Sequence, residues 1–172
     1  MKKIIYFLAI LIFFFISCNN KQKNNFNSTN KTSKEETIKS AIPIFDFQTL
    51  KDLLVKNPKK IILLNFWATW CGACREEIPD LIQFYDEYKD KIILIGLCLD
   101  KSEENIKNFI KLAKINFPIY KADDQLTRHF MVQTIPATYI FKNGKFIDMH
   151  IGPYYYADLK RDINILEKQK VK

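Results

Sequence analysis

Histidine is scarce in this sequence: His129 and His150 are the only two among 172 residues. The sequence also has no H-x-x-H motif, and its one C-x-x-C motif lies at Cys71 and Cys74. A structural zinc site needs four ligands, usually cysteine and histidine in such pairs, so these absences leave no metal site to predict. We expect both histidines in surface or hydrogen-bonded structural positions.

The sequence also lacks a basic cluster that could bind nucleic acid and an apolar run long enough to span a membrane. The net charge of +8 comes from scattered lysines, and no basic cluster or stripe is present, so the composition argues against nucleic-acid binding. The longest apolar run, Ile4 to Ile16, has 13 residues, whereas a membrane-spanning helix needs about 20. Because Lys2 and Lys3 precede it, this run is typical of the apolar region of an export signal.

The residues after this run predict how the chain is anchored. Ser17-Cys18 resembles the lipobox of a bacterial lipoprotein signal, which implies cleavage before Cys18 and lipid attachment to that cysteine. Ordinary signal cleavage and an uncleaved anchor are the alternatives. Residues 19–40 hold too little apolar surface to fold, so we expect a flexible tether. The expected organisation is a signal peptide over 1–17, the lipidated cysteine and tether over 18–40, and a folded domain over 41–172, membrane-anchored in the cell envelope and facing the periplasm.

Strand-like and helix-like patterns alternate through residues 41–172. Ile61–Phe66 and Ile92–Leu99 are almost wholly apolar, as expected of central strands that are buried on both faces. Asn143-Gly144 separates two later strand patterns and favours a tight hairpin. We therefore expect an α/β domain with helices on both faces of a central sheet. The other predicted strands are 42–47, 117–120, 138–141 and 145–151, and the predicted helices are 49–56, 72–88, 102–115, 123–131 and 158–168.

The run from Phe66 to Cys74, FWATWCGAC, carries the clearest chemistry. It places Cys71 and Cys74 between a buried strand and a helix. A helix N-terminus carries partial positive charge and unpaired N–H groups, which lower the pKa of a thiol there below its usual value of about 8.5. Cys71 is then the nucleophile, and Cys74, one turn into the helix, resolves the mixed disulfide. A zinc pair or an inert structural disulfide is the alternative.

Together with two later motifs, this run resembles the thioredoxin fold. Ile135-Pro136-Ala137-Thr138 is similar to the cis-proline loop of that superfamily, and Phe141-Lys142-Asn143-Gly144 is similar to the hairpin that follows it. The resemblance extends over about residues 42–168. It is closest to the exported TlpA/ResA-like group, because the stretch from Asp100 to Pro136 is longer than in a minimal thioredoxin. It implies a mixed β-sheet flanked by helices, with an inserted helix and strand.

The resemblance also implies roles for residues near the cysteines. Pro136 is expected to follow a cis peptide bond, and Ile135 and Pro136 would present backbone groups to an extended substrate. Trp70 would form a flat apolar platform beside the site. Gly72 and Ala73, the dipeptide between the cysteines, would tune the reduction potential.

Glu77 has two interpretations. In the ResA-like group, a glutamate at the matching position is associated with tuning the redox pair, and a partly buried carboxylate there could pass protons to Cys74. The alternative is an exposed glutamate that merely suits the start of a helix. Trp67 and Cys98 fall in strand patterns, where we expect a core side chain and a buried free thiol.

These residues predict a thiol-disulfide oxidoreductase without a cofactor. The resemblance implies a reductase that acts on disulfides of exported proteins and is recharged by a membrane thiol donor of the CcdA/DsbD kind. Cytochrome c maturation is one function of that group. Ile135 before Pro136 favours a reductant. A disulfide-forming oxidase or isomerase on the same fold, and a non-catalytic binding lipoprotein, are the alternatives.

Overall fold

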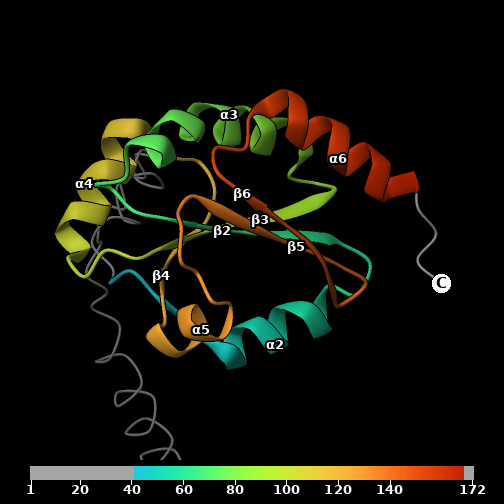
Figure 1. Ribbon diagram of the computed structural model, residues 1–172, viewed down its shortest axis with the longest axis horizontal. Helices are drawn as coiled ribbons and strands as arrows, with labels where there is room; N and C mark the ends of the chain where they lie inside the picture. Colours follow the sequence, from blue (N-terminus) through green and yellow to red (C-terminus); the bar gives the residue numbers. More distant parts are fainter. Residues whose placement is uncertain (1–40, 169–172) are drawn as a thin grey trace, which may run out of the picture. The chain divides into compact units, whose positions relative to one another are not determined.

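The computed structural model describes residues 41–168 of the chain. The predicted signal peptide, Cys18, the tether and residues 169–172 lie outside the described residues. Within the described range, six strands and five helices alternate (Figure 1). Their order is β1 (Ile44–Phe45), α2 (Phe47–Lys56), β2 (Ile61–Trp67), α3 (Gly72–Tyr88), β3 (Ile92–Cys98), α4 (Glu103–Ala113), β4 (Ile119–Ala122), α5 (Asp124–His129), β5 (Ala137–Lys142), β6 (Lys145–Ile151) and α6 (Tyr156–Lys168).

All six of these strands belong to one mixed sheet, in the order β1-β4-β3-β2-β5-β6. β2 is parallel to β3 and antiparallel to β5, and each of its residues is buried, as its apolar run predicts. β5 and β6 form the predicted hairpin. Its turn residues Asn143 and Gly144 both have positive φ, 53° and 72°, which the tight hairpin turn requires.

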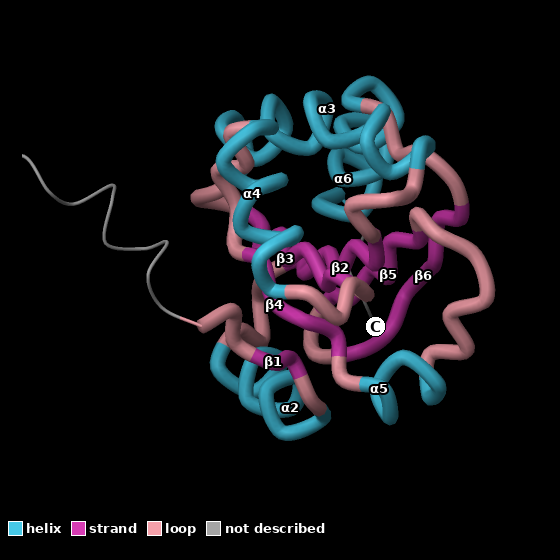
Figure 2. The backbone as a smooth tube through the Cα atoms, turned by 90° about the vertical axis from the view of Figure 1, so that its left-hand side faces the viewer, coloured by secondary structure: helices cyan, strands magenta, loops and turns pink. Residues whose placement is uncertain are grey.

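Helices cover both faces of the sheet. Figures 1 and 2 show α3, α4 and α6 on one face and α2 and α5 on the other. One buried cluster joins Leu81 of α3 and Leu159 of α6 to the sheet, and a second joins Leu50 of α2 and Leu126 of α5 to the opposite face. The predicted α/β class, with helices on both faces, is therefore confirmed.

The long stretch between β3 and the proline loop forms α4, β4 and α5. β4 pairs with β3 and in turn pairs with β1 at the edge of the sheet. Ser102 and Asp123 cap the two helices, because their side-chain oxygens accept hydrogen bonds from backbone N–H groups of the first turn. This stretch contains the extra helix and strand that the resemblance to the TlpA/ResA-like group implies.

Some element boundaries differ from the predicted ones. The strand predicted over 42–47 shortens to β1, because Asp46 leaves the sheet to cap α2. The Asp46 carboxylate accepts a hydrogen bond from the Thr49 N–H at 2.8 Å, so α2 begins at Phe47. α6 likewise begins earlier than predicted, at Tyr156. No helix between residues 41 and 168 is both long enough and apolar enough to cross a membrane.

Candidate active site

Cys71 and Cys74 lie at the start of α3, after the turn that follows β2. Cys71 is the N-cap: its backbone is extended, and its sulfur accepts a hydrogen bond from the Cys74 N–H at 3.1 Å. The two sulfurs form a disulfide over a Cα–Cα distance of 5.3 Å. Cys71 is 7% exposed and Cys74 is fully buried, so a reaction partner reaches Cys71 first. Between them, Gly72 is exposed and Ala73 is half-buried.

This position favours a thiolate once the disulfide is reduced. The Cys71 sulfur lies where the dipole of a 17-residue helix is positive, and the Cys74 N–H already points at it. Both effects stabilise the charged form of a sulfur. The geometry is therefore that of a nucleophilic cysteine followed, one turn later, by a shielded partner.

Asp100 holds the turn that carries the cysteines. This buried residue follows β3, and its Oδ2 accepts a hydrogen bond from the Thr69 N–H at 2.9 Å, while its Oδ1 accepts one from the Thr69 hydroxyl. Cys98 donates its thiol to the same Oδ2 at 3.3 Å. The sequence patterns did not identify Asp100 as a residue of the site. A signal existed, because parallel β2 and β3 end at the same edge of the sheet, which places residues after β3 beside the cysteine turn.

The loop before β5 faces the disulfide. The Ile135–Pro136 peptide bond is cis, as the sequence predicts, and the Ile135 carbonyl oxygen lies 3.8 Å from the Cys71 sulfur. The Pro136 carbonyl accepts a hydrogen bond from the Gly152 N–H at 2.9 Å, which ties this loop to the end of β6. Trp70, immediately before Cys71, is 69% exposed, so its ring is available for contact with another polypeptide.

Glu77 is fully buried on α3, three residues after Cys74. Its Oε1 accepts a hydrogen bond from the Asn65 side-chain amide, and its Oε2 accepts one from the Tyr154 N–H, each at 2.8 Å. Burial raises the pKa of Glu77 from 4.5 to about 7, against the lowering effect of these two hydrogen bonds, and the charge of Asp80 adds to the rise. The interpretation of Glu77 as an exposed helix residue is therefore wrong.

Asn65 and Tyr154 complete the surroundings of Glu77. The Asn65 amide nitrogen also donates to the Thr138 hydroxyl at 3.0 Å, while its Oδ1 is buried without a hydrogen-bond partner. Tyr154 contributes only its backbone N–H, a group that the identity of the side chain does not reveal. Its position two residues after Gly152 could be read from the sequence, but its contact with Glu77, 77 positions away, could not.

The remaining predicted residues take structural positions. Trp67 is fully buried, and Cys98 is a buried free thiol whose pKa burial raises to about 12. His129 is exposed and contacts the Phe47 ring edge-on. His150 is half-buried and hydrogen-bonded to a backbone carbonyl. Between residues 41 and 168, no three histidine, cysteine, aspartate or glutamate side chains are grouped as metal ligands would be.

Comparison with known proteins agrees with this geometry. Residues 38–150 match the model of the AhpC/TSA family. Thioredoxin-like protein YneN of Bacillus subtilis is 31% identical over 130 residues, which cover 72% of this chain and 76% of that protein. Thiol-disulfide oxidoreductase ResA of Oceanobacillus iheyensis is 27% identical over 172 residues, which cover 97% of this chain and 88% of the relative.

A solved structure extends the likeness to three dimensions. The crystal structure of StoA from Bacillus subtilis superposes with a TM-score of 0.56 at 29% identity, over 62% of this chain and 84% of StoA. The fold of this chain is thus one already seen in a solved structure. The chain belongs to the AhpC/TSA family and is a TlpA/ResA-like thiol-disulfide oxidoreductase of the thioredoxin superfamily.

Proposed function

We propose that this protein is a membrane-tethered reductase for disulfides of exported proteins. The observation that carries the proposal is the position of Cys71. It is the N-cap of α3, it is the more exposed sulfur of the pair, and it lies 3.8 Å from the Ile135 carbonyl. A polypeptide that binds along the proline loop would bring its own disulfide to this sulfur.

The reaction begins with the reduced pair. The Cys71 thiolate attacks one sulfur of the substrate disulfide, the substrate S–S bond breaks, and the departing substrate sulfur takes up a proton. Cys74 then loses its proton to Glu77 and attacks the Cys71 sulfur, which expels the second substrate sulfur as a thiolate as the Cys71–Cys74 bond forms, and that thiolate takes up a proton from water. The substrate gains two electrons and two protons, and the cysteine pair loses two electrons.

Glu77 is suited to accept the proton that leaves Cys74. The two residues are three positions apart on α3, so their side chains lie on the same face of the helix. The pKa of Glu77, raised to about 7 by burial, lets the carboxyl gain and lose a proton at neutral pH. Direct proton exchange between Cys74 and bulk water is limited, because Cys74 and Glu77 are both fully buried.

The surroundings of Cys71 suit an extended polypeptide. Ile135 and Pro136 would offer backbone groups to the substrate chain, and the exposed Trp70 ring would cover an apolar part of it. Gly72 and Ala73 lie between the two sulfurs and would set the reduction potential. Ile135 before Pro136 resembles the reducing members of the superfamily and supports a reductase.

The membrane anchor, the periplasmic location and the electron donor are inferred from the sequence and from the family resemblance. Cys18 would carry the lipid, and residues 19–40 would hold the domain near the membrane on the periplasmic side. A membrane thiol donor of the CcdA/DsbD kind would return two electrons to the oxidised pair. The haem-binding cysteines of apocytochrome c are one substrate class of this group, which makes cytochrome c maturation the pathway to test first.

Insulin reduction with dithiothreitol as electron donor tests the chemistry. Cys71→Ala should abolish turnover, whereas the control Cys98→Ala should retain it, because Cys98 is buried and not part of the disulfide. Full activity of Cys71→Ala would refute the proposal. A reduction potential near that of thioredoxin, about −270 mV, supports a reductase, and one near that of DsbA, about −120 mV, would identify an oxidase instead.

Covalent capture in cells tests the partners. Cys74→Ser removes the resolving sulfur, so mixed disulfides with Cys71 should accumulate and can be identified by mass spectrometry. We expect exported proteins with paired cysteines, and the membrane thiol donor. A wild-type pair locked in one redox state, with no captured partner, would indicate the non-catalytic binding role.

A further inference from the structure

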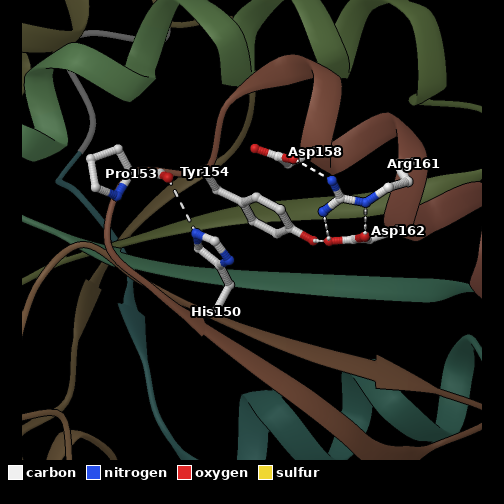
Figure 3. Close-up of polar contacts among 6 residues, drawn as sticks. All are labelled: His150, Pro153, Tyr154, Asp158, Arg161 and Asp162. Atoms are coloured by element: carbon white, nitrogen blue, oxygen red, sulfur yellow. Dashed lines mark hydrogen bonds and ion pairs between the residues drawn. The ribbon is translucent and has the colours of Figure 1, made fainter.

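One peptide unit lies between His150 and Glu77. The His150 Nε2 lies 3.2 Å from the carbonyl oxygen of Pro153 (Figure 3). The next backbone N–H, that of Tyr154, donates to the Glu77 Oε2 at 2.8 Å. The carbonyl of Pro153 and the N–H of Tyr154 are the two ends of the same planar amide, so His150 and Glu77 are joined through it.

The direction of these hydrogen bonds follows from the chemistry of the amide. A carbonyl oxygen can only accept, so the His150 Nε2 carries the hydrogen, in the neutral or the charged ring. Donation to the Pro153 carbonyl draws electron density toward that oxygen. The Tyr154 N–H then becomes a stronger donor, because hydrogen bonds in a chain polarise one another. A stronger donor favours the ionised carboxyl of Glu77 over the neutral one.

We propose that His150 is a positioning residue for Glu77, which through the Pro153–Tyr154 peptide stabilises the ionised carboxylate and so sets how readily Glu77 takes a proton from the cysteine pair. The inference rests on the proton-accepting role of Glu77 in the proposed function. His150, half-buried on β6, would thus influence the site without a direct contact to Glu77.

The packing around Tyr154 keeps this peptide in place. The His150 ring stacks on the Tyr154 ring, with centroids 4.0 Å apart and planes 9° from parallel. From the other side, the Tyr154 hydroxyl donates to Asp162 Oδ2 at 2.7 Å (Figure 3). Arg161 in turn binds Asp162 at 2.9 Å and Asp158 at 2.6 Å. The ring is therefore held between β6 and α6, and the amide that leads to Glu77 cannot turn freely.

Three carboxylates, those of Asp162, Asp148 and Asp80, act on Tyr154 or Glu77. The pKa of Asp162 on α6 is lowered against the effect of burial, chiefly by its hydrogen bonds from Arg161 and Tyr154 and least by His150. The pKa of Tyr154 is raised mainly by burial and next by Asp162, with a smaller contribution from Asp148 on β6. On α3, Asp80 acts on Glu77 and raises its pKa. None of these carboxylates hydrogen-bonds to the Pro153–Tyr154 amide among the described contacts, so a change at His150 tests that amide specifically.

Two substitutions separate the hydrogen bond from the ring stack. His150→Phe keeps a ring on Tyr154 and removes the donor, whereas His150→Gln places an amide N–H near the position of Nε2 and removes the ring. Both are made in the full chain, purified in detergent in its disulfide form. The pKa of Glu77 is read from the carboxyl carbon resonance of ¹³C-labelled glutamate, and the signal is assigned by its loss in Glu77→Gln.

We expect His150→Phe to raise the pKa of Glu77 by about 0.5. The reason is that the hydrogen bond from the Tyr154 N–H to the charged carboxylate should lose roughly 10–30% of its strength. His150→Gln should restore the wild-type value. An unchanged Glu77 in the Phe variant, or an equal rise in the Gln variant, would overturn the inference. One measurement needs no variant: the ¹⁵N spectrum of wild-type His150 should show a protonated Nε2, and a bare Nε2 would equally overturn it.

The pH profile of insulin reduction connects this step to turnover. In His150→Phe the inflection that Glu77→Gln abolishes should move to higher pH, and in His150→Gln it should return. The spectra are taken on the resting disulfide form and do not depend on activity. Turnover that survives Cys71→Ala refutes the proposed function alone, whereas an unshifted Glu77 resonance in an active His150→Phe variant refutes the His150 inference alone.

Discussion

Replacing Glu77 by glutamine should change how stability depends on pH. Burial raises the pKa of Glu77 from 4.5 to about 7 in the folded chain, whereas the unfolded chain titrates it at its ordinary value. Between those values the folded state holds a proton that the unfolded state releases, so the free energy of unfolding falls as the pH rises. At about 1.36 kcal/mol for each pH unit, the loss amounts to ~3 kcal/mol, complete above pH 7.

Glutamine removes this loss and keeps the shape of the site. Its oxygen can accept the Tyr154 N–H, and its amide nitrogen can face Asn65, whose Oδ1 has no partner and accepts once that amide turns over. At pH 5 the variant should be more stable by only ~1 kcal/mol, because the folded carboxyl is neutral there and the unfolded one, with a pKa of 4.5, is just past its midpoint. At pH 8.5 the variant should be more stable by up to ~3 kcal/mol.

Urea unfolding of the disulfide form at half-unit steps from pH 5 to pH 9 measures the difference. The carboxylates whose pKa is lowered, such as Asp46 and Asp162, lose their contribution only as the pH falls through their own low values, below this window. Glu76→Gln is the matched control, because Glu76 is exposed on the same helix. A pH slope that persists unchanged in Glu77→Gln would refute the assignment of the raised pKa to Glu77.

One substitution and one labelling experiment probe the scaffold. Gly96→Ala should lower the free energy of unfolding, measured in urea, by ~1–3 kcal/mol, because the added Cβ would lie 2.4 Å from Ile119 Cδ1 and 2.9 Å from Trp67 Nε1. Gly72→Ala is the control, because a Cβ there would have nothing within 4 Å. Equal stability of the two variants would contradict this reasoning. Cys98 should resist iodoacetamide at pH 8 in the folded protein and react after unfolding, because burial raises its pKa to about 12; labelling at the same rate in both states would show that the thiol is accessible.

Local signals were sufficient for most of the fold. β2 was predictable because the almost wholly apolar run Ile61–Phe66 suits a strand that is buried on both faces. Asn143-Gly144 specified the hairpin through its need for positive φ. Cys71 and Cys74 were predictable because their function depends on spacing along one helix turn. Each of these features is encoded within fewer than ten consecutive residues.

Features that depend on distant contacts were not predictable in the same way. The sequence left Glu77 open between a buried and an exposed interpretation, because only the approach of β2 and of the segment before α6 covers it. Asp100 acts on a turn 31 positions away. β1 shortened for a different reason: Asp46 caps the N-terminus of α2 instead of continuing the strand, so one local preference overrides another.

The buried pair of Glu77 and Asn65 has a hydrogen-bonding pattern that suits a carboxyl able to change its charge. The ionised carboxylate accepts from the Asn65 amide and from the Tyr154 N–H, which leaves the Asn65 Oδ1 without a partner. If Glu77 takes a proton, its Oε1–H becomes a donor, and a half-turn of the Asn65 amide presents that oxygen as the acceptor. Each protonation state thus has a partner for the carboxyl, and in each state the other end of the Asn65 amide lacks one: its oxygen beside the carboxylate, its NH2 beside the neutral acid. The amide therefore does not favour either state, and burial is what raises the pKa of Glu77 to about 7, where the carboxyl can accept the proton that Cys74 loses.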